Sequence, residues 1–313
     1  MAMMLFCRHI IINRPSVLQE KGPLLIASNH PNSFLDAVIF DALFEPPIWS
    51  LARGDVFKHK FIIKILTWLK ILPVYRVSEG VENLGANYQT FESCRNIFRK
   101  NGVVLIFTEG RCINEWHLRT LKKGTARLAL SSWADGIPLR ILPVGINYSS
   151  FRRFGKNMFI NFGNIIQEQD IPREASEGLR IQAINRELVS QFGELVYEIE
   201  KKDLVKQKSL LERKPNSLET ILLALPAMLG WMIHLPLYLP LRLFTKVKAN
   251  HNDHYDSILT ALLLFSYPFY LLLLSIILFI FTQSWLSFLA ILIIPFTAWA
   301  TVRLKPQLDY RGK

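Results

Sequence analysis

A histidine and an aspartate in the segment SNHPNSFLDA, residues 28–37, have the residue types and spacing of a catalytic pair. A carboxylate beside an imidazole fixes the histidine tautomer and stabilises the imidazolium that forms when the ring takes a proton. His30 and Asp36 also fit ordinary helix capping, with Ser33 as the N-cap residue and Asp36 near the positive end of the helix. Both interpretations stay open here, because a capped helix can also carry a catalytic acid.

Two further segments carry polar residues after short apolar runs. FTEGR at residues 107–111 supplies Glu109, Gly110 and Arg111, and LPVYR ends at Arg76. Glycine permits close approach of a ligand to the backbone, and arginine binds phosphate through two parallel hydrogen bonds. Each arginine alone is more often an ordinary surface residue. Together with a histidine base, they indicate a hydroxyl nucleophile on a phosphorylated substrate.

The elements that must position these residues alternate along the first two thirds of the chain. Short runs rich in branched residues predict strands at 23–28, 47–52, 71–76, 102–107 and 141–148. Helical patterns lie near 34–44, 58–70, 82–100 and 122–134. The alternation predicts an α/β fold with a largely parallel central sheet flanked by helices.

Ligand sites in such sheets form beyond the carboxyl ends of the strands. His30, Arg76 and Glu109 each follow or end a predicted strand, so we expect them at one edge of the sheet. The charged stretch 176–207 is predicted to be a single solvated helix that closes the domain without a chemical role.

The composition indicates a membrane-facing protein rather than an ordinary soluble enzyme. Hydrophobic residue types make up 50% of the 313 residues, and the formal net charge is +12. Residues from Ser217 onward carry seven basic and four acidic residues, or +3, which leaves +9 on the part before them. Such a basic body is attracted to anionic lipid headgroups or phosphorylated substrates. Nucleic acid is not expected as a partner, since the basic residues are scattered and no nucleic-acid motif accompanies them.

Cysteine and histidine usage points to neither a disulfide framework nor a metal site. The three cysteines, Cys7, Cys94 and Cys112, form no CxxC pair, so a reducing compartment is expected. HNDH at residues 251–254 has the residue types of metal ligands, but in a polar connector it is interpreted as a solvated loop. The N-terminal segment lacks the long apolar run and cleavage site of a secretory signal, which favours a cytoplasmic catalytic part.

The chain is predicted to divide into a catalytic domain, residues 1–215, and a hydrophobic membrane region, residues 216–313. No charged residue occurs from Ser257 to Val302, a run of 46. About 20 residues suffice for a helix to cross a bilayer. The run 258–302 is therefore predicted to form a helical hairpin.

The polar break TQS, residues 282–284, divides that hairpin into helices at 258–281 and 285–302. The uncharged segment 221–241 differs from it, since it contains three prolines and has basic residues on both sides. Lysine and arginine accumulate in cytoplasmic flanks, so this segment is predicted to be interfacial or re-entrant rather than a span.

NHPNSFLD, LPVYR, FTEGR and ILPVGINY, in that order, resemble the four motif blocks of the PlsC-like glycerophospholipid acyltransferase superfamily. That superfamily includes glycerol-3-phosphate and lysophosphatidic acid acyltransferases. LKKGTARLAL at 121–130 resembles the stretch after the third block, and FINFGNII at 159–166 the strand after the fourth. Two features depart from the usual pattern: five residues rather than four separate His30 from Asp36, and Arg111 replaces a serine or threonine.

The resemblance implies a role for each site residue. His30 would be the general base that deprotonates a glycerol hydroxyl, and Asp36 would be its orienting acid. The substrate-binding residues implied for the glycerol phosphate acceptor and its surroundings are Arg76, Glu109, Gly110, Arg111 and Lys123. The hydroxyl would attack an acyl thioester directly, with acyl-CoA or acyl carrier protein as co-substrate and no metal or other cofactor.

The resulting hypothesis is a membrane-bound O-acyltransferase of phospholipid biosynthesis that acylates glycerol 3-phosphate or 1-acyl-glycerol 3-phosphate. Its expected partners are membrane lipids and the thioester donor, and its catalytic domain is expected on the cytoplasmic face of the cytoplasmic membrane. Two alternatives stay open. One is a membrane-anchored lipid-binding protein without turnover, and the other is a lipid or thioester hydrolase that directs the same histidine base at water.

Overall fold

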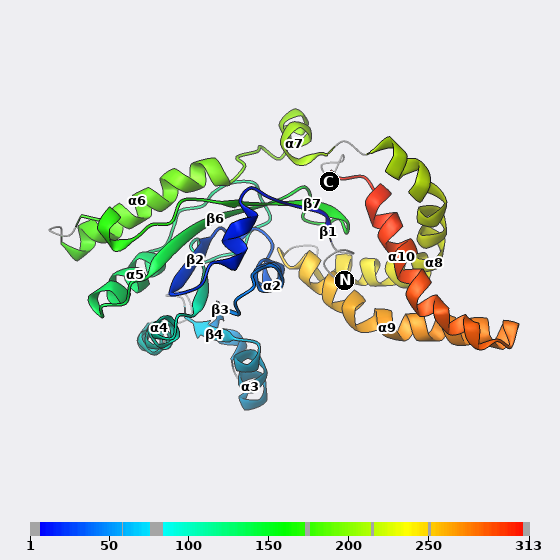
Figure 1. The fold of residues 1–313 in the computed structure, drawn as a ribbon, viewed down its shortest axis with the longest axis horizontal. Coiled ribbons are helices and arrows are strands. Elements are labelled where there is room, and N and C mark those ends of the chain that lie inside the picture. Colours follow the sequence, from blue (N-terminus) through cyan, green and yellow to red (C-terminus); the bar gives the residue numbers. More distant parts are fainter. Residues whose placement is uncertain are drawn as a thin grey trace.

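The alternating strand and helix patterns form a sheet of seven strands in the order β1-β7-β6-β2-β5-β3-β4 (Figure 1). Neighbouring strands are parallel except for β6 and β7, which confirms the α/β fold with a largely parallel sheet. The computed structural model describes residues 7–57, 59–75, 84–172, 176–213, 216–249 and 252–308.

The observed elements follow the predicted ones closely. The strands are β1 (Cys7–Ile12), β2 (Leu24–Ser28), β3 (Ile48–Arg53), β4 (Ile71–Val74), β5 (Val103–Phe107), β6 (Arg140–Tyr148) and β7 (Lys156–Phe162). The helices of this part are α2 (Phe34–Leu43), α3 (Lys60–Trp68), α4 (Leu84–Arg99), α5 (Gly124–Ala134), α6 (Glu177–Leu195) and α7 (Leu204–Leu211).

Two elements of the catalytic part differ from the prediction. Strand β1 was not expected, and it pairs in parallel with β7 at the edge of the sheet. The stretch 176–207 forms two helices rather than one, since α6 ends at Leu195 and α7 begins at Leu204. Between them Ile199 is fully buried and forms a β-bridge with Trp116. The chain leaves the helix there to bury an apolar side chain, so the interpretation as one solvated helix was wrong.

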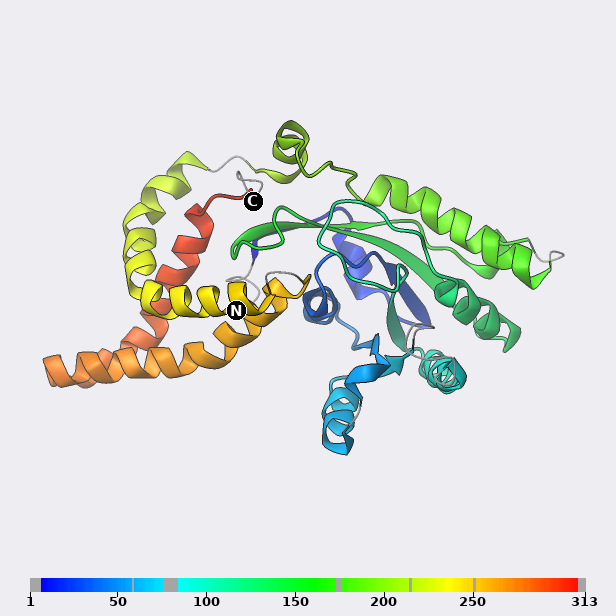
Figure 2. The same cartoon turned by 180° about the vertical axis from the view of Figure 1, so that it is seen from behind.

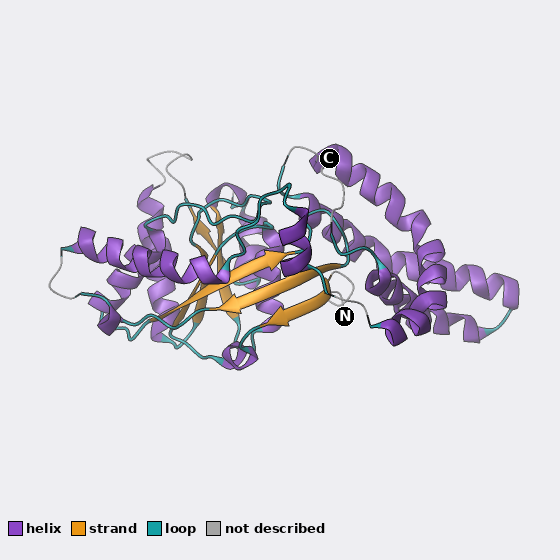
Figure 3. Cartoon of the chain, turned by 90° about the horizontal axis from the view of Figure 1, so that it is seen from above, coloured by secondary structure: helices purple, strands orange, loops and turns teal. Residues whose placement is uncertain are grey.

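Helices cover both faces of the sheet, so its central strands are buried (Figure 3). Every residue of β2 is buried, with Leu24 and Ile26 in one hydrophobic cluster and Leu25 and Ala27 in the other. Helix α2 contributes to the first cluster and α5 to the second. Complete burial of a leucine or isoleucine contributes about 1.5 to 3 kcal/mol relative to exposure. The carboxyl end of β2, where His30 follows, is therefore a rigid platform.

The last third of the described chain forms three apolar helices, α8 (Ser217–Ala249), α9 (Tyr255–Thr282) and α10 (Ala290–Leu304). The apolar segments of α8 and α9, and the segment Trp285–Leu304 that contains α10, are long and apolar enough to cross a membrane. Figures 1 and 2 show this region beside the sheet rather than across either of its faces.

The segment 221–241 lies within α8, which is continuous over 33 residues despite Pro226, Pro236 and Pro240. A straight helix of that length would extend about 50 Å, well beyond the roughly 30 Å of a bilayer core. The helix instead bends (Figure 1), as internal prolines cause helices to do. Its Gly230 packs so closely on α10 that a Cβ would lie 2.1 Å from the Thr297 carbonyl oxygen.

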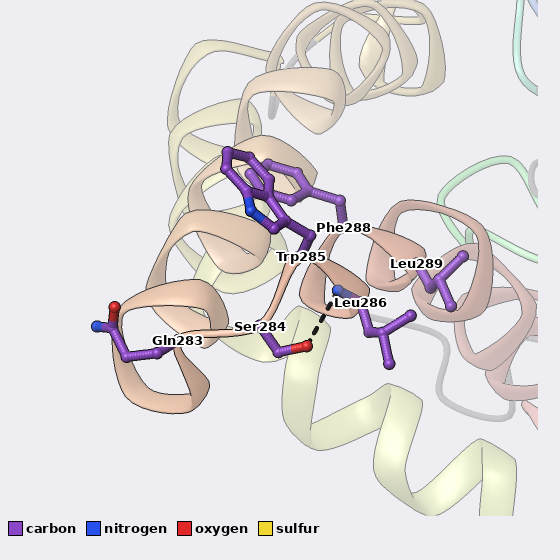
Figure 4. Close-up of a pocket in the computed structure, with 6 residues that line it drawn as sticks. All are labelled: Gln283, Ser284, Trp285, Leu286, Phe288 and Leu289. Carbon is purple, nitrogen blue, oxygen red and sulfur yellow. Dashed lines mark hydrogen bonds between the residues drawn. The ribbon is translucent and has the colours of Figure 1, made fainter.

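The predicted break at residues 282–284 coincides with the end of α9 at Thr282. Gln283 has a positive φ of 52°, and the Ser284 hydroxyl accepts a hydrogen bond from the Leu286 N–H at 3.3 Å (Figure 4). The side chains of this turn line a hollow of about 570 Å³. No residue proposed for catalysis or substrate binding lines it, so it belongs to the hairpin and not to the site.

Helix α3 is the most exposed apolar element of the catalytic part. None of its residues is buried, and the side chains of Phe61 and Trp68 are 74% and 80% exposed. Lys60 and Lys64 are exposed on the same helix. It follows β3, so it leaves the sheet at the edge where β2 leads to His30.

Candidate active site

The structure brings the predicted pair His30 and Asp36 together. His30 lies in the loop between the end of β2 and the start of α2, and Asp36 lies in the first turn of α2. His30 Nδ1 is 2.9 Å from Asp36 Oδ2. The Asp36 side chain is fully buried, whereas that of His30 is 16% exposed. A buried carboxylate with a partly exposed imidazole is the arrangement that a general base requires.

Asp36 is held by two further donors. Its Oδ1 accepts a hydrogen bond from the Tyr148 hydroxyl at 2.7 Å, and its Oδ2 also accepts from the Asn32 backbone N–H at 2.8 Å. Burial, and next the Asp36 carboxylate, raise the pKa of Tyr148 well above 10, so its hydroxyl remains a donor. Buried charges need such partners to offset the loss of hydration.

The geometry also fixes the role of the second imidazole nitrogen. Since the Asp36 carboxylate only accepts, His30 Nδ1 carries a proton and donates it to Oδ2. Among the described residues, His30 Nε2 has no hydrogen-bond partner. The ring stacks on Phe107 at the end of β5, with centroids 3.8 Å apart and planes 12° apart. The stacking and the contact with Asp36 therefore hold the ring in one orientation, with Nε2 on the side away from the carboxylate.

Ser33 does not cap α2 through its side chain, as the capping interpretation would require. It occupies the N-cap position but makes no side-chain cap hydrogen bond, and its φ of 57° lies in the left-handed region. Its N–H instead donates to Cys112 Sγ at 2.9 Å, and its hydroxyl bonds to His254 Nδ1 at 2.6 Å. A non-glycine residue holds this conformation only where its surroundings enforce it. The loop at residues 29–33 is thus fixed by contacts from distant segments.

Glu109 joins two loops of the site. Its side chain is buried, with one oxygen accepting from the His30 N–H and the other from the Arg119 N–H, each at 2.9 Å. Burial raises the pKa of the Glu109 carboxyl, although the two N–H donors oppose the shift. Both oxygens are used internally, so the observed role of Glu109 is to position His30. Acceptor binding by Glu109 stays a prediction.

The other predicted substrate-binding residues are Gly110, Arg111, Lys123 and Arg76. Gly110 has a φ of 65°, which glycine adopts without cost, and it closes a turn by donating its N–H to the Phe107 carbonyl at 3.1 Å. Arg111 and Lys123 are exposed, the latter at the N-cap position of α5. Arg76 lies outside the described residues. The substrate contacts of these residues therefore stay predictions.

Sequence reasoning missed several residues that build the site. Tyr148 ends β6, and its position in ILPVGINY as the polar tip of a buried strand was the available signal.

The connector between α8 and α9 also contributes residues to the site, and its sequence gave a weaker signal of this role. Asp253 Oδ1 accepts from the Asn114 N–H at 3.0 Å, and exposed His254 bonds to Ser33, so the solvated-loop interpretation was wrong for these residues. Within the described residues, no group of three His, Cys, Asp or Glu side chains is placed to hold a metal ion.

The fold and this site define a class of protein: an α/β protein in which a histidine, oriented by a buried carboxylate, follows the end of a parallel strand. Residues 9–147 match the family model described as Acyltransferase, which confirms the resemblance of the motifs. The matched segment covers β2, β5, most of β6 and the loop that carries His30. The crystal structure of the 1-acyl-sn-glycerophosphate (LPA) acyltransferase PlsC from Thermotoga maritima is similar, with 15% identity and a TM-score of 0.41 over 60% of this chain and 74% of that chain. No curated protein matches the chain.

Proposed function

We propose that the protein is a membrane-bound O-acyltransferase that moves a fatty acyl group from acyl-CoA or acyl carrier protein to glycerol 3-phosphate or 1-acyl-glycerol 3-phosphate. The observation that carries the proposal is the oriented His30, whose Nδ1 is held by Asp36 and whose Nε2 has no partner among the described residues. An imidazole fixed in this tautomer serves as a general base for a hydroxyl nucleophile.

The reaction follows from that geometry. His30 Nε2 takes the proton of the acceptor hydroxyl while the hydroxyl oxygen attacks the thioester carbonyl carbon. The C–S bond then breaks, and the departing thiolate takes the proton from the imidazolium, which leaves an ester and a thiol. Asp36 stabilises the imidazolium in between and stays ionised throughout. No acyl-enzyme is required, and the sequence holds no GxSxG nucleophile motif.

The phosphate of the acceptor needs cationic partners near His30. Arg111 follows the turn that Gly110 closes, and its side chain is exposed to an incoming substrate. Arg76 and Lys123 complete the proposed set from the loops after β4 and before α5. Arginine suits this role because its planar fork binds two phosphate oxygens at once.

Membrane attachment with the catalytic domain on the cytoplasmic face is supported by where the apolar helices end. The α9–α10 hairpin has both ends against the catalytic part: Asp256 at the start of α9 pairs with Lys156 of β7, and Arg303 near the end of α10 donates to the Arg8 carbonyl at 2.7 Å. A helical hairpin that enters and leaves the membrane must have both of its ends on the same side of the membrane. The exposed Phe61 and Trp68 on α3, with lysines beside them, suit a lipid surface at the same edge.

One assay separates this proposal from the two alternatives. The purified protein is incubated with radiolabelled acyl-CoA and either glycerol 3-phosphate or lysophosphatidic acid, and the lipid products are resolved. We expect label in lysophosphatidic acid or phosphatidic acid, respectively. Free labelled fatty acid without an acylated acceptor would indicate the hydrolase, and bound but unchanged acyl-CoA would indicate the lipid-binding protein.

A further inference from the structure

The connector between α8 and α9 contacts the loop that carries His30. Asp256, in the first turn of α9, accepts a hydrogen bond on Oδ2 from the side-chain amide of Asn32 at 2.9 Å. His254 bonds to the hydroxyl of Ser33 at 2.6 Å. Two consecutive loop residues are thus held by a segment more than 220 positions later in the chain, as the sequence separations of 224 and 221 show.

A second contact reaches the same loop through its neighbour. Asp253 accepts from the Asn114 N–H at 3.0 Å, and the Asn114 side-chain amide donates to the Pro31 carbonyl at 2.7 Å. The residues 31, 32 and 33 are therefore all held from this part of the chain: Ser33 by His254 of the connector, Asn32 by Asp256 of α9, and Pro31 by the connector through Asn114.

Asp256 is itself anchored in the catalytic part. Its side chain and that of Lys156 are 1% and 0% exposed, and the two form an ion pair. The Lys156 ammonium also lies 5.7 Å from the centre of the Tyr148 ring. A buried charge pair of this kind holds its partners in one arrangement, because separating them would leave a charge without compensation.

Asn32 connects this pair to the catalytic one. Its side-chain amide donates to Asp256, while its backbone N–H donates to the Oδ2 of Asp36 that also binds His30. Asn32 is fully buried, and only its NH₂ group can donate to a carboxylate, so the orientation of the amide is fixed. A continuous series of contacts runs from Lys156 through Asp256, Asn32 and Asp36 to His30.

We propose that Asp256 is a positioning residue for the His30–Asp36 pair, so that the start of the membrane-length helix α9 holds the catalytic loop in its active geometry. Asp256 touches no reacting atom and acts through the hydrogen bond that its Oδ2 accepts from Asn32. Displacement of a catalytic group by about 1 Å can reduce a rate by about 100-fold. The test of this proposal by kcat rests on the proposed acyltransferase function.

Two double variants of the full-length protein in lipid nanodiscs isolate that hydrogen bond. Lys156→Met with Asp256→Asn removes both charges but keeps an amide oxygen that can accept from Asn32. Lys156→Met with Asp256→Leu removes both charges and the acceptor. Replacing both members of a buried ion pair by uncharged residues is often neutral for stability, so thermal unfolding should be similar for the two.

We expect the asparagine variant to keep a kcat near that of the unmodified protein and the leucine variant to lose about 10-fold to 100-fold in kcat. The KM for acyl-CoA should change little in either, because the Asp256 side chain is 1% exposed and offers almost no surface to a substrate. Equal kcat values in two folded variants would overturn the proposal. A loss confined to KM would do the same.

Hydrogen–deuterium exchange of peptides covering residues 28–37 gives a readout that does not depend on the substrate. We expect faster exchange there in the leucine variant than in the asparagine variant. This difference in exchange is expected even if the protein proves inactive with every acyl donor. Failure of the proposed function can therefore be distinguished from failure of the positioning role of Asp256. Equal exchange in that segment would overturn the positioning role of Asp256.

Should both double variants fail to fold, Asp253→Ala replaces them. Unchanged kcat and unchanged exchange in that variant would likewise overturn the proposal.

Discussion

The imidazole Nδ1 of His30 lies 2.9 Å from the buried Oδ2 of Asp36. This contact and the stacking of the ring on Phe107 together fix the orientation of the imidazole, and the proposed function assigns its Nε2 to the substrate hydroxyl. The chemistry of the site depends on that one orientation, so the first tests address the groups that set it.

His30→Ala should lower acyl transfer by about 10² to 10⁴, the usual contribution of a general base, without loss of the fold. His30 is a loop residue with a partly exposed side chain, so its removal leaves the hydrophobic clusters intact. His59→Ala, at an exposed position before α3, is the matched control and should retain activity. Near-normal turnover of a folded His30→Ala enzyme would mean that His30 is not the base.

Tyr148→Phe should reduce kcat while leaving both KM values nearly unchanged. The substitution removes the hydroxyl that donates to Asp36 Oδ1 at 2.7 Å. A hydrogen bond to a charged group contributes about 1.5 to 3 kcal/mol, and each 1.4 kcal/mol of lost transition-state stabilisation is about tenfold in rate. Tyr197→Phe serves as the control, since its hydroxyl has no hydrogen bond to the described residues. If both variants behaved alike, Tyr148 would have only a packing role.

Arg76→Ala and Arg111→Ala should each weaken binding of the phosphorylated acceptor more than binding of the acyl donor. Loss of a charge-assisted hydrogen bond costs about 1.5 to 3 kcal/mol, which corresponds to roughly a tenfold to hundredfold rise in the acceptor KM. Arg127→Ala, at an exposed position one turn further along α5 than Lys123, provides the matched control. Equal effects on the two substrates would remove the altered arginine from the acceptor site.

The stability contributed by Glu109 should depend on pH with a definite sign. Burial raises its pKa above 4.5, so the folded state binds the proton more tightly than the unfolded state does. The stability that Glu109 contributes is complete below pH 4.5, and it is lost as the pH rises through the raised pKa of the folded state. Relative to Glu109→Gln, which does not titrate, the melting temperature of the unmodified protein should therefore fall as the pH rises above 4.5. A difference that grew with pH would show that the two N–H donors outweigh burial.

The arrangement in the membrane can be tested by labelling single cysteines in intact cells. Ser190 is exposed on α6 and Gln283 is exposed at the end of α9, so cysteines at these positions report on the catalytic part and on the hairpin turn. The three native cysteines are replaced first. An impermeant reagent should not reach position 190 before the cells are lysed, and position 283 should react from outside if either does. Labelling at 190 in intact cells would place the catalytic part on the other face.

Local patterns in the sequence predicted most of the fold. Branched, apolar runs such as 102–107 became strands because both faces of a parallel sheet are covered, and the four helices predicted between residues 34 and 134 matched to within two residues. Strand β1 escaped prediction because Arg8 and His9 interrupt its short apolar run. The break at Val196 in 176–207 depends on the burial of Ile199 against Trp116, which no local pattern reveals.

Local sequence patterns also predicted only part of the candidate site. The spacing of His30 and Asp36 is local, since they lie six positions apart on either side of a helix start, and their proximity could be predicted. Tyr148 is 112 positions from Asp36, and Asp256 is 224 positions from Asn32. Such pairs are determined by the order of the strands and by the docking of the apolar helices, and sequence periodicity carries no information on either.

The ion pair between Lys156 and Asp256 means that the catalytic part and the apolar helices are not separable folding units. A chain ended near residue 215 would keep β7 but lose the carboxylate that neutralises Lys156, a change that typically costs about 3 to 5 kcal/mol. It would also lose the Val302 carbonyl that accepts from buried Arg8 at 3.3 Å. Composition changes abruptly near residue 215, but these contacts cross that point, so we expect a chain shortened there to be less stable than the full chain.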